Sequence, residues 1–327
     1  MRVTPHSQTR SLWYIGQNEC ALKDEILPQL TKEDVLIRML WSGISRGTER
    51  LVFQGRVPAS ENSRMRCPHQ QGDFPYPVKY GYCAVGQVED GPDDLLGKTI
   101  FTLHPHQERF VVPTNAVTVL PDGLPPRRAV LAANMETALN ALWDAGAAPG
   151  DKIIIVGGGV LGLLVAALAA KLPGADVTLV DIDAARAAFA QKLGYGFAMP
   201  ENTPDEADIV IHTSATSAGL ATAINAAGLE ATILELSWHG TGETSVALGG
   251  AFHSKRLKLI SSQVGQVSPT HRPRWSHAKR LAKALDLLCD ESFEMLITDE
   301  ISFGDSPAHL PKLFASEAAG LTAVLRY

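Results

Sequence analysis

The stretch Ile153-Ile154-Ile155-Val156-Gly157-Gly158-Gly159-Val160-Leu161-Gly162 decides the fold of this 327-residue chain. Its first four residues are β-branched, three glycines then break the run, and good helix formers continue it to Ala170. That order predicts a strand, a tight turn and a helix. Ile153–Ala170 is eighteen apolar or glycine residues long, near the lower limit for a membrane span, but the internal break argues against that alternative. We therefore expect no membrane partner.

The glycines have the spacing of a dinucleotide-binding turn. Gly157, Gly159 and Gly162 match G-x-G-x-x-G, in which the first glycine permits the turn, the second lets a pyrophosphate approach and the third lets helix pack on strand. Asp181 ends the next apolar run, where a carboxylate accepts hydrogen bonds from ribose and repels a 2′-phosphate. The pattern favours NAD(H) over NADP(H). The alternative is a plain turn with Asp181 as a helix cap, and Asp183 is a rival for the ribose role.

Alternating strand and helix patterns extend from Lys152 to about Val264. Strands are expected at Ile153–Val156, Val177–Val180, Ile209–His212, Thr232–Leu236 and Leu257–Ile260, and helices at Leu161–Leu172, Ala184–Leu193 and Ala218–Ala227. Such alternation predicts an α/β fold with a doubly wound parallel sheet of the Rossmann type.

Ligands bind outside the carboxyl ends of parallel strands, so residues that follow those ends are expected to contact the cofactor. Together with the turn and the acid, the expected cofactor-binding residues are Gly157, Gly159, Val160, Leu161, Gly162, Asp181, Ile182, Ser214, Ser237 and Ser262. Any single one of these serines is also an ordinary turn residue.

The first 125 residues alternate short β-like runs with Gly and Pro, as in Val35–Leu40, Tyr82–Val88 and Phe110–Val112. Pro121–Pro126 marks a boundary, after which a helical pattern runs from Arg127 toward Ala145. An amphipathic helix is expected at Ser276–Cys289, and Ala323–Arg326 reads as a strand that returns to the first domain.

Composition limits the function classes. A net charge of −6, with 45% hydrophobic and 20% charged residues, is typical of a globular protein and argues against nucleic acid as the main partner. The four cysteines are far apart and form no C-x-x-C pair, which suits a reducing cytoplasm. The polar segment Met1–Arg10 has no signal-peptide character.

Three runs resemble the medium-chain dehydrogenase/reductase family, and the likeness extends over essentially the whole chain. They are Ser42–Glu49, Pro77–Gly86 and Asn134–Leu142. The resemblance implies a GroES-like, mostly β catalytic domain at 1–125, completed by 268–327, and an NAD-binding Rossmann domain at 126–267. It also implies an oxidoreductase with a small-molecule substrate, and relatives are often homodimers or homotetramers.

The resemblance also implies that this chain is a zinc-lacking member. Zinc-using members bind the ion through a Cys, a His and a Cys or Asp, and the matching positions here are Ser45, Tyr82 and Ala133. Neutral hydroxyls are poor zinc ligands and a methyl group is none, so we expect no metal site. No cysteine lies between Cys83 and Cys289, so the family's structural zinc lobe is missing as well. Similar zinc-free branches are the quinone and enoyl reductases, and the run from Ser42 also resembles bacteriochlorophyllide dehydrogenases.

A metal-free site needs another group to stabilise or protonate the substrate oxygen. The expected catalytic residues are Tyr82, Ser45, Thr48 and His104. Tyr82 is the first candidate for proton donor, because the resemblance puts it where a zinc ligand would point into the cleft, and Ser45 and Thr48 would relay the proton. The alternatives are that Tyr82 is a packed aromatic and that His104 belongs to an exposed loop.

These expectations combine into one hypothesis with two rivals. The chain is expected to be an NAD(H)-dependent, zinc-independent oxidoreductase that acts on an alcohol/carbonyl pair. The first rival is an enone or quinone reductase of the same family. The second is a non-catalytic NAD(H)-binding sensor, which the fold alone permits.

Overall fold

The structure is a computed structural model that describes residues 8–315 and 318–327. The first seven residues of the segment Met1–Arg10 therefore lie outside the description. Two compact units make up the chain: unit 1 is Met1–Ala133 with Leu285–Tyr327, and unit 2 is Asn134–Ala284. Within the described residues, no helix combines the length and the apolar character that crossing a bilayer requires.

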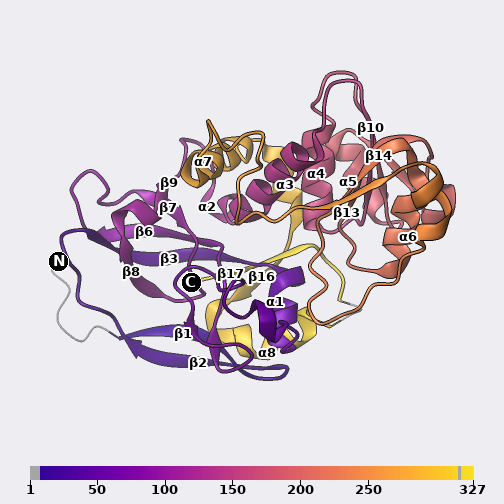
Figure 1. The fold of residues 1–327 in the computed structure, drawn as a ribbon. Helices are drawn as coiled ribbons and strands as arrows, with labels where there is room; N and C mark the ends of the chain where they lie inside the picture. The colour runs from indigo at the N-terminus through magenta and orange to yellow at the C-terminus, as the bar shows by residue number, and fades with distance from the viewer. Residues whose placement is uncertain (1–7, 316–317) are drawn as a thin grey trace. The chain divides into compact units, whose positions relative to one another are not determined.

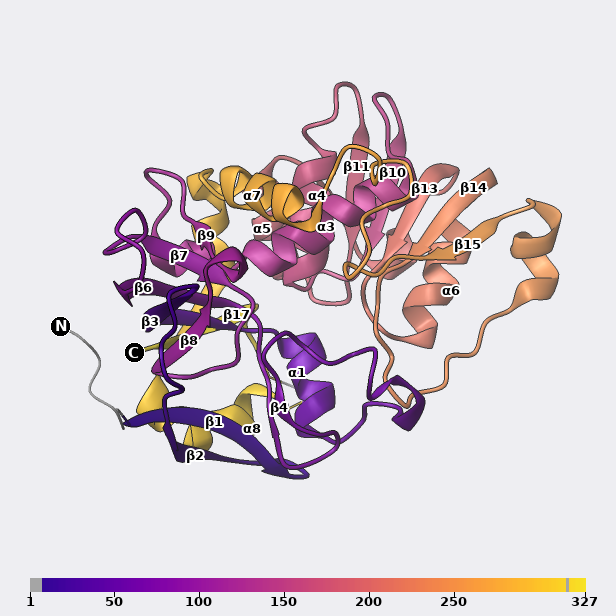
Figure 2. The same ribbon diagram turned by 60° about the vertical axis from the view of Figure 1, so that its left-hand side comes forward.

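Unit 2 contains the predicted parallel sheet. Its strand order is β12-β11-β10-β13-β14-β15, and every pairing is parallel. The strands are β10 (Lys152–Val156), β11 (Asp176–Val180), β12 (Gly196–Ala198), β13 (Ala207–His212), β14 (Ala227–Glu235) and β15 (Lys258–Ser261). Figure 2 shows β10, β13, β14 and β15 side by side. The predicted Rossmann fold is confirmed.

Helices α4 (Val160–Ala169), α5 (Arg186–Leu193) and α6 (Ser217–Ala226) connect these strands. Strand β14 begins at Ala227, before the predicted Thr232. The sequence did not indicate this start, because Gly228 and the left-handed Glu230 (φ 59°) are not typical strand residues. The core of this sheet is aliphatic and includes Ile154, Val210 and Ile233, none of which is accessible to solvent. Burial of such side chains is the main stabilising contribution, at about 1.5–3 kcal/mol each.

Unit 1 is built from two sheets, most of whose strands are labelled in Figure 1. The larger has the order β16-β17-β3-β6-β7-β9, with β8 also paired to β3; the smaller has the order β2-β1-β5-β4. The larger sheet consists of β3 (Asp34–Ile44), β6 (Ala84–Asp90), β7 (Thr99–Thr102), β8 (Arg109–Pro113), β9 (Thr118–Val119), β16 (Ile297–Ser302) and β17 (Thr322–Arg326). The smaller consists of β1 (Gln8–Gly16), β2 (Glu19–Ile26), β4 (Gln71–Gly72) and β5 (Val78–Lys79).

The predicted returning strand is present as β17, which pairs antiparallel with β3 and parallel with β16. The continuous helix expected from Arg127 to Ala145 was wrong, because it is divided into α2 (Pro126–Ala129) and α3 (Ala132–Ala145). At the break, Val130 packs closely on Gly43: a β-carbon added to Gly43 would lie 3.1 Å from the β-carbon of Val130. The other helices are α1 (Arg46–Phe53), α7 (His277–Leu287) and α8 (Ser306–Leu313).

Candidate functional site

The glycine turn of unit 2 has the close contacts that its spacing predicts. Gly157 has φ +115°, and a β-carbon on it would lie 2.7 Å from the Thr213 hydroxyl. A β-carbon on Gly162 would lie 1.9 Å from the carbonyl oxygen of Gly157, so only glycine lets the helix approach the turn this closely. Gly159, the N-cap of α4, faces open space, with no atom within 4 Å of its notional β-carbon. The turn is therefore closed toward the sheet and open at Gly159.

The acid after β11 is held against this turn. The Asp181 carboxylate accepts hydrogen bonds from the backbone N–H of Gly158 and, at 2.7 Å, from that of Asp183. Asp183 accepts from the N–H of Ala185, and Arg186 lies 3.3 Å from its carboxylate. Asp181 therefore lies beside the glycines, and Asp183 lies before α5, whose N-cap is Ala185. Contact of Asp181, Asp183 or the adjacent Ile182 with a cofactor stays a prediction.

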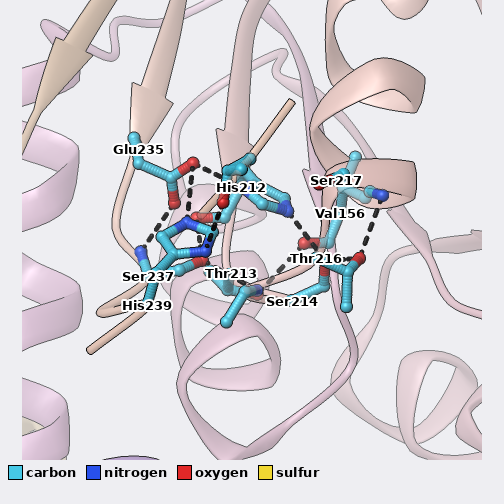
Figure 3. Close-up of polar contacts among 12 residues, drawn as sticks. Val156, His212, Thr213, Ser214, Thr216, Ser217, Glu235, Ser237 and His239 are labelled. Carbon is cyan, nitrogen blue, oxygen red and sulfur yellow. Dashed lines mark hydrogen bonds and ion pairs between the residues drawn. The ribbon is translucent and has the colours of Figure 1, made fainter. Parts of the chain in front are cut away.

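Side chains from the ends of β13 and β14 form one polar network (Figure 3). His212 bonds through Nδ1 to Glu235 Oε2 and through Nε2 to the Ser214 hydroxyl, both at 2.7 Å. The Ser237 hydroxyl accepts from the N–H of Ala215, and the N–H of Ser237 donates to Glu235 at 2.8 Å. Ser214 and Ser237 therefore meet in one cluster.

The third expected strand-end serine lies elsewhere in unit 2. The Ser262 hydroxyl donates to Asp144 at 2.6 Å. Its expected contact with the cofactor stays a prediction, as do those of Ser214, Ser237, Val160 and Leu161.

The polar network contains a residue combination that the sequence did not single out. Glu235 Oε2 lies 3.6 Å from His239 Nε2 as well as 2.7 Å from His212 Nδ1. Burial raises the pKa of Glu235, but hydrogen bonds from His212 and Ser237 outweigh it, so the pKa is lowered and the carboxylate stays charged. Sequence reasoning missed this group because His212 and Glu235 belong to different strands.

In unit 1, three of the predicted catalytic residues come together. The Tyr82 hydroxyl is hydrogen-bonded to the hydroxyls of Ser45 and Thr48. Ser45 immediately precedes α1, Thr48 lies in its first turn, and Tyr82 lies two residues before β6. Burial raises the pKa of Tyr82 far above its usual value of 10.0, and the hydrogen bonds only partly oppose this, so the phenol stays protonated. The tyrosine is half-buried as a residue, although its hydroxyl lies inside.

A buried network supports this hydroxyl cluster. Glu49 is fully buried and accepts hydrogen bonds from the N–H of Ser45 (2.8 Å), the hydroxyl of Tyr14 (2.7 Å) and Nε2 of His106 (2.9 Å). His106 in turn meets the Ser42 hydroxyl at 2.7 Å. Through these hydrogen bonds the network holds the backbone of Ser45 in place and so positions its side chain before α1. Sequence reasoning named neither Glu49 nor His106 as a supporting residue.

His104, the fourth predicted catalytic residue, is buried in unit 1. Its ring stacks on Phe110 with centroids 3.8 Å apart, and its Nδ1 lies 2.9 Å from the carbonyl oxygen of Pro105. Burial lowers its pKa well below 6.5, so the ring is neutral at neutral pH. The exposed-loop alternative for His104 is wrong, because its side chain is only 5% exposed. A catalytic role for it stays a prediction.

Known dehydrogenases share both sequence and fold with this chain, although no protein-family model matches it. D-guloside 3-dehydrogenase of Escherichia coli (strain K12) is 24% identical over 308 residues, which cover 84% of this chain and 87% of that protein. An uncharacterized zinc-type alcohol dehydrogenase-like protein of Haemophilus influenzae is 30% identical over 221 residues, 63% of this chain and 60% of that protein. L-idonate 5-dehydrogenase of Escherichia coli superposes with a TM-score of 0.81 at 14% identity, covering 98% of this chain and 99% of the other.

These likenesses are consistent with the medium-chain dehydrogenase/reductase family. It is an oxidoreductase of the dehydrogenase type, and its GroES-like and Rossmann folds are those of the family. Two further structures carry different cofactors at similar likeness. One, provisionally described as a zinc-binding dehydrogenase of Sinorhizobium meliloti 1021, is bound to NADP (TM-score 0.79, 18% identity, 98% of this chain and 100% of that one). The other, an alcohol dehydrogenase of Escherichia coli CFT073, is in complex with NADH (TM-score 0.78, 16% identity, the same coverage).

The residues that the sequence resemblance matches to the family's zinc position do not fit a zinc ion. Ser45 and Tyr82 offer hydroxyls that bond to each other, and burial keeps the tyrosine protonated. Ala133 contributes only a methyl side chain. A catalytic zinc site requires about three nitrogen, thiolate or carboxylate ligands, so no catalytic step is routed through zinc at this position.

An ion pair is buried inside unit 2. Arg280 is only 1% exposed, donates through Nε to Glu136 at 3.0 Å and also bonds to the carbonyl oxygens of Val264 and Gln266. Burial raises the pKa of Glu136 despite the nearby guanidinium. An acid near the start of a helix usually complements the helix dipole, and an arginine in a basic stretch is usually solvated, but these two side chains are buried against each other.

Proposed function

We propose that this chain is an NAD(H)-dependent oxidoreductase that interconverts an alcohol and a carbonyl group of a small organic molecule without zinc at the family's position. The observation that carries the proposal is the glycine turn closed onto Asp181, open only at Gly159. A closed backbone turn with a free helix N-terminus is the arrangement that binds pyrophosphate. The likeness to known dehydrogenases supports the same reaction class.

The chain's residues fit a nicotinamide dinucleotide. The backbone at Gly159–Leu161 would bind the pyrophosphate. Each carboxylate oxygen of Asp181 has a lone pair left that would accept a hydrogen bond from a hydroxyl of the adenosine ribose. Ile182 is 83% exposed, a large apolar surface that a flat adenine ring would cover. When bound, the cofactor supplies or accepts a hydride. The proposal assigns cofactor binding to the domain at 126–267 and substrate chemistry to 1–125 with 268–327.

Tyr82 is the proposed proton donor of the metal-free site. Reduction of a carbonyl leaves negative charge on its oxygen, which must be stabilised or protonated. A phenol that stays neutral at neutral pH donates a hydrogen bond to that oxygen, and Ser45 and Thr48 can pass a proton to it through their hydroxyls. Glu49 holds the Ser45 backbone in place for this relay.

The names of the relatives suggest the substrate class. D-guloside 3-dehydrogenase and L-idonate 5-dehydrogenase are both named for a secondary hydroxyl of a polyhydroxylated carbon chain. We infer that a sugar, a glycoside or a sugar acid with such a hydroxyl is the substrate. The four cysteines of the chain are free, which fits a cytoplasmic location, and a homodimer or homotetramer belongs to the same proposal by analogy with the family.

Replacing Tyr82 by phenylalanine is expected to lower kcat by about 100-fold, because one positioned acid contributes roughly 10²–10⁴-fold. The affinity for NADH should not change, since the variant leaves unit 2 intact. Turnover is followed by nicotinamide absorbance with pooled sugars, glycosides and sugar acids, after dialysis against a chelator. The same assay in His239→Gln tests whether turnover depends on His212, Glu235 and His239 of unit 2 instead of on Tyr82.

Tyr76→Phe is the matched control for Tyr82→Phe. The Tyr76 hydroxyl also donates a hydrogen bond in unit 1, but its acceptor is the backbone carbonyl of Phe53. It should keep nearly full turnover. Equal turnover in Tyr82→Phe and wild type would reject Tyr82 as proton donor. Tight NADH binding with no turnover on any of the pooled substrates would favour the sensor instead.

Replacing Asp181 by serine is expected to shift cofactor preference toward NADPH. A carboxylate about 4 Å from a phosphate is repelled by up to a few kcal/mol near a protein surface, so the ratio of the Kd for NADPH to that for NADH should fall about tenfold or more. Fluorescence titration with both cofactors measures this ratio. Asp183→Ser is the control, because its carboxylate faces Ala185 and Arg186 instead. An equal shift in both variants, or none in either, would contradict the assignment.

A further inference from the structure

Strand pairing brings a histidine and a glutamate together at one edge of the unit 2 sheet. In the parallel pairing of β13 with β14, His212 lies directly opposite Glu235. His239 follows Glu235 by four residues, after the strand has ended, and its ring centroid lies 6.2 Å from that of His212. Figure 3 shows the three side chains converging. One potential ligand atom from each lies within 4.8 Å of the others.

Each of these side chains is held by its other polar atom. His212 Nε2 bonds to the Ser214 hydroxyl at 2.7 Å, and His239 Nδ1 bonds to the Thr244 hydroxyl at 2.8 Å. Glu235 Oε1 accepts from the N–H of Ser237 at 2.8 Å. Metal-binding histidines and carboxylates are oriented in this way by hydrogen bonds to their outer atoms. The inner atoms of His212 and Glu235 are hydrogen-bonded to each other at 2.7 Å, so an ion would replace the proton between them.

We propose that His212 Nδ1, Glu235 Oε2 and His239 Nε2 bind one divalent first-row transition-metal ion, such as Zn²⁺ or Co²⁺. The site is separate from the family's zinc position in unit 1, and it does not depend on the proposed function. Within residues 8–315 and 318–327, this is the one group of three or more His, Cys, Asp or Glu side chains whose ligand atoms converge in this manner.

The ligand set and its spacing select the class of ion. Two imidazoles and one carboxylate suit Zn²⁺ and its neighbours, whereas Mg²⁺ and Ca²⁺ prefer oxygen ligands alone. Ligand atoms about 2.0–2.1 Å from a tetrahedral ion are roughly 3.4 Å apart. The observed separations from Glu235 Oε2 are 2.7 Å and 3.6 Å, which bracket that value, so a small side-chain adjustment admits the ion. Three protein ligands leave a coordination position for water or an oxygen of a ligand.

Metal binding by the full-length chain tests the proposal directly. Protein freed of metal by a chelator is titrated with Co²⁺, whose visible absorption reports tetrahedral nitrogen and oxygen ligation, and with Zn²⁺ by calorimetry. Wild type is expected to bind one equivalent more than His239→Gln or Glu235→Gln, and each variant should lose affinity at this site by about 100-fold or more. His253→Gln, an exposed histidine of the same unit, is the control and should bind as wild type does.

Two outcomes overturn the proposal. One is wild type that takes up no stoichiometric Co²⁺ or Zn²⁺, and the other is uptake unchanged in both variants, which would place the ion elsewhere. His239 is partly exposed and outside the strands, so its replacement leaves the sheet intact, and circular dichroism verifies this. Because the readout is metal uptake, a failure here leaves the Tyr82 and Asp181 experiments unaffected.

Discussion

Replacing Gly162 by alanine is expected to destabilise unit 2 by about 3 kcal/mol or more, because the added methyl group has no space. Its β-carbon would lie 1.9 Å from the Gly157 carbonyl oxygen and 2.9 Å from the Thr213 hydroxyl. The first of these atoms is backbone, so α4 must move away from the turn. Because the displaced turn is the proposed pyrophosphate site, NADH affinity should fall as well. Thermal unfolding and NADH titration measure the two effects.

Gly159→Ala separates binding from stability. No atom lies within 4 Å of its notional β-carbon, and its φ of −69° is accessible to alanine, so the melting temperature should stay close to that of wild type. NADH affinity should still fall, because the methyl group occupies the space where the proposed pyrophosphate approaches. Unchanged NADH affinity in both glycine variants would reject the turn as the dinucleotide site.

Replacing Arg280 by methionine is expected to lower the free energy of unfolding by about 3–5 kcal/mol, since removing one partner leaves the other charge buried and unpaired. Glu136 would lose its partner, and the carbonyl oxygens of Val264 and Gln266 would lose a donor. Urea unfolding monitored by circular dichroism gives the change, provided that the slope with denaturant stays constant.

Two further variants test the cause of that loss. Lys279→Met, one residue away on the exposed side of α7, should change stability by less than about 0.5 kcal/mol. The double variant Glu136→Gln/Arg280→Met should recover part of the loss, because it no longer buries an unpaired carboxylate. A loss below about 1 kcal/mol in Arg280→Met would mean that the pair contributes little.

Local patterns in the sequence predict the fold and the dinucleotide turn well. The run Ile153–Gly162 contains its own strand, turn and helix signals, and Asp181 follows at the end of the next strand, so short-range spacing is enough. Tyr82, Ser45 and Thr48 could be grouped because the family resemblance relates their positions. The pairing of His212 with Glu235 could not be predicted in the same way, since it depends on the register between two strands.

The burial of two charged residues, Arg280 and Glu49, was also not predicted from the sequence. Arg280 lies in a basic stretch that suggests a solvated surface, yet it is four residues before Ala284, which is completely buried, and so lies on the same helix face. Helical periodicity therefore contained the signal. Glu49 gave no such sign, because two of its partners, Tyr14 and His106, are 35 and 57 positions away in the chain, and only the folded unit brings them together.

Strand β17 has a consequence for the order in which the protein can be made. It pairs with the second half of β3, from Trp41 to Ile44, whereas β8 pairs with the first half on the same side. The second half therefore has no neighbour on that side until residues about 280 positions later in the chain have emerged from the ribosome. Unit 2 is continuous from Asn134 to Ala284 and can complete its sheet while synthesis is still under way. Unit 1 cannot complete its larger sheet until the end of synthesis, and until then this part of the β3 edge is exposed to pairing with other strands.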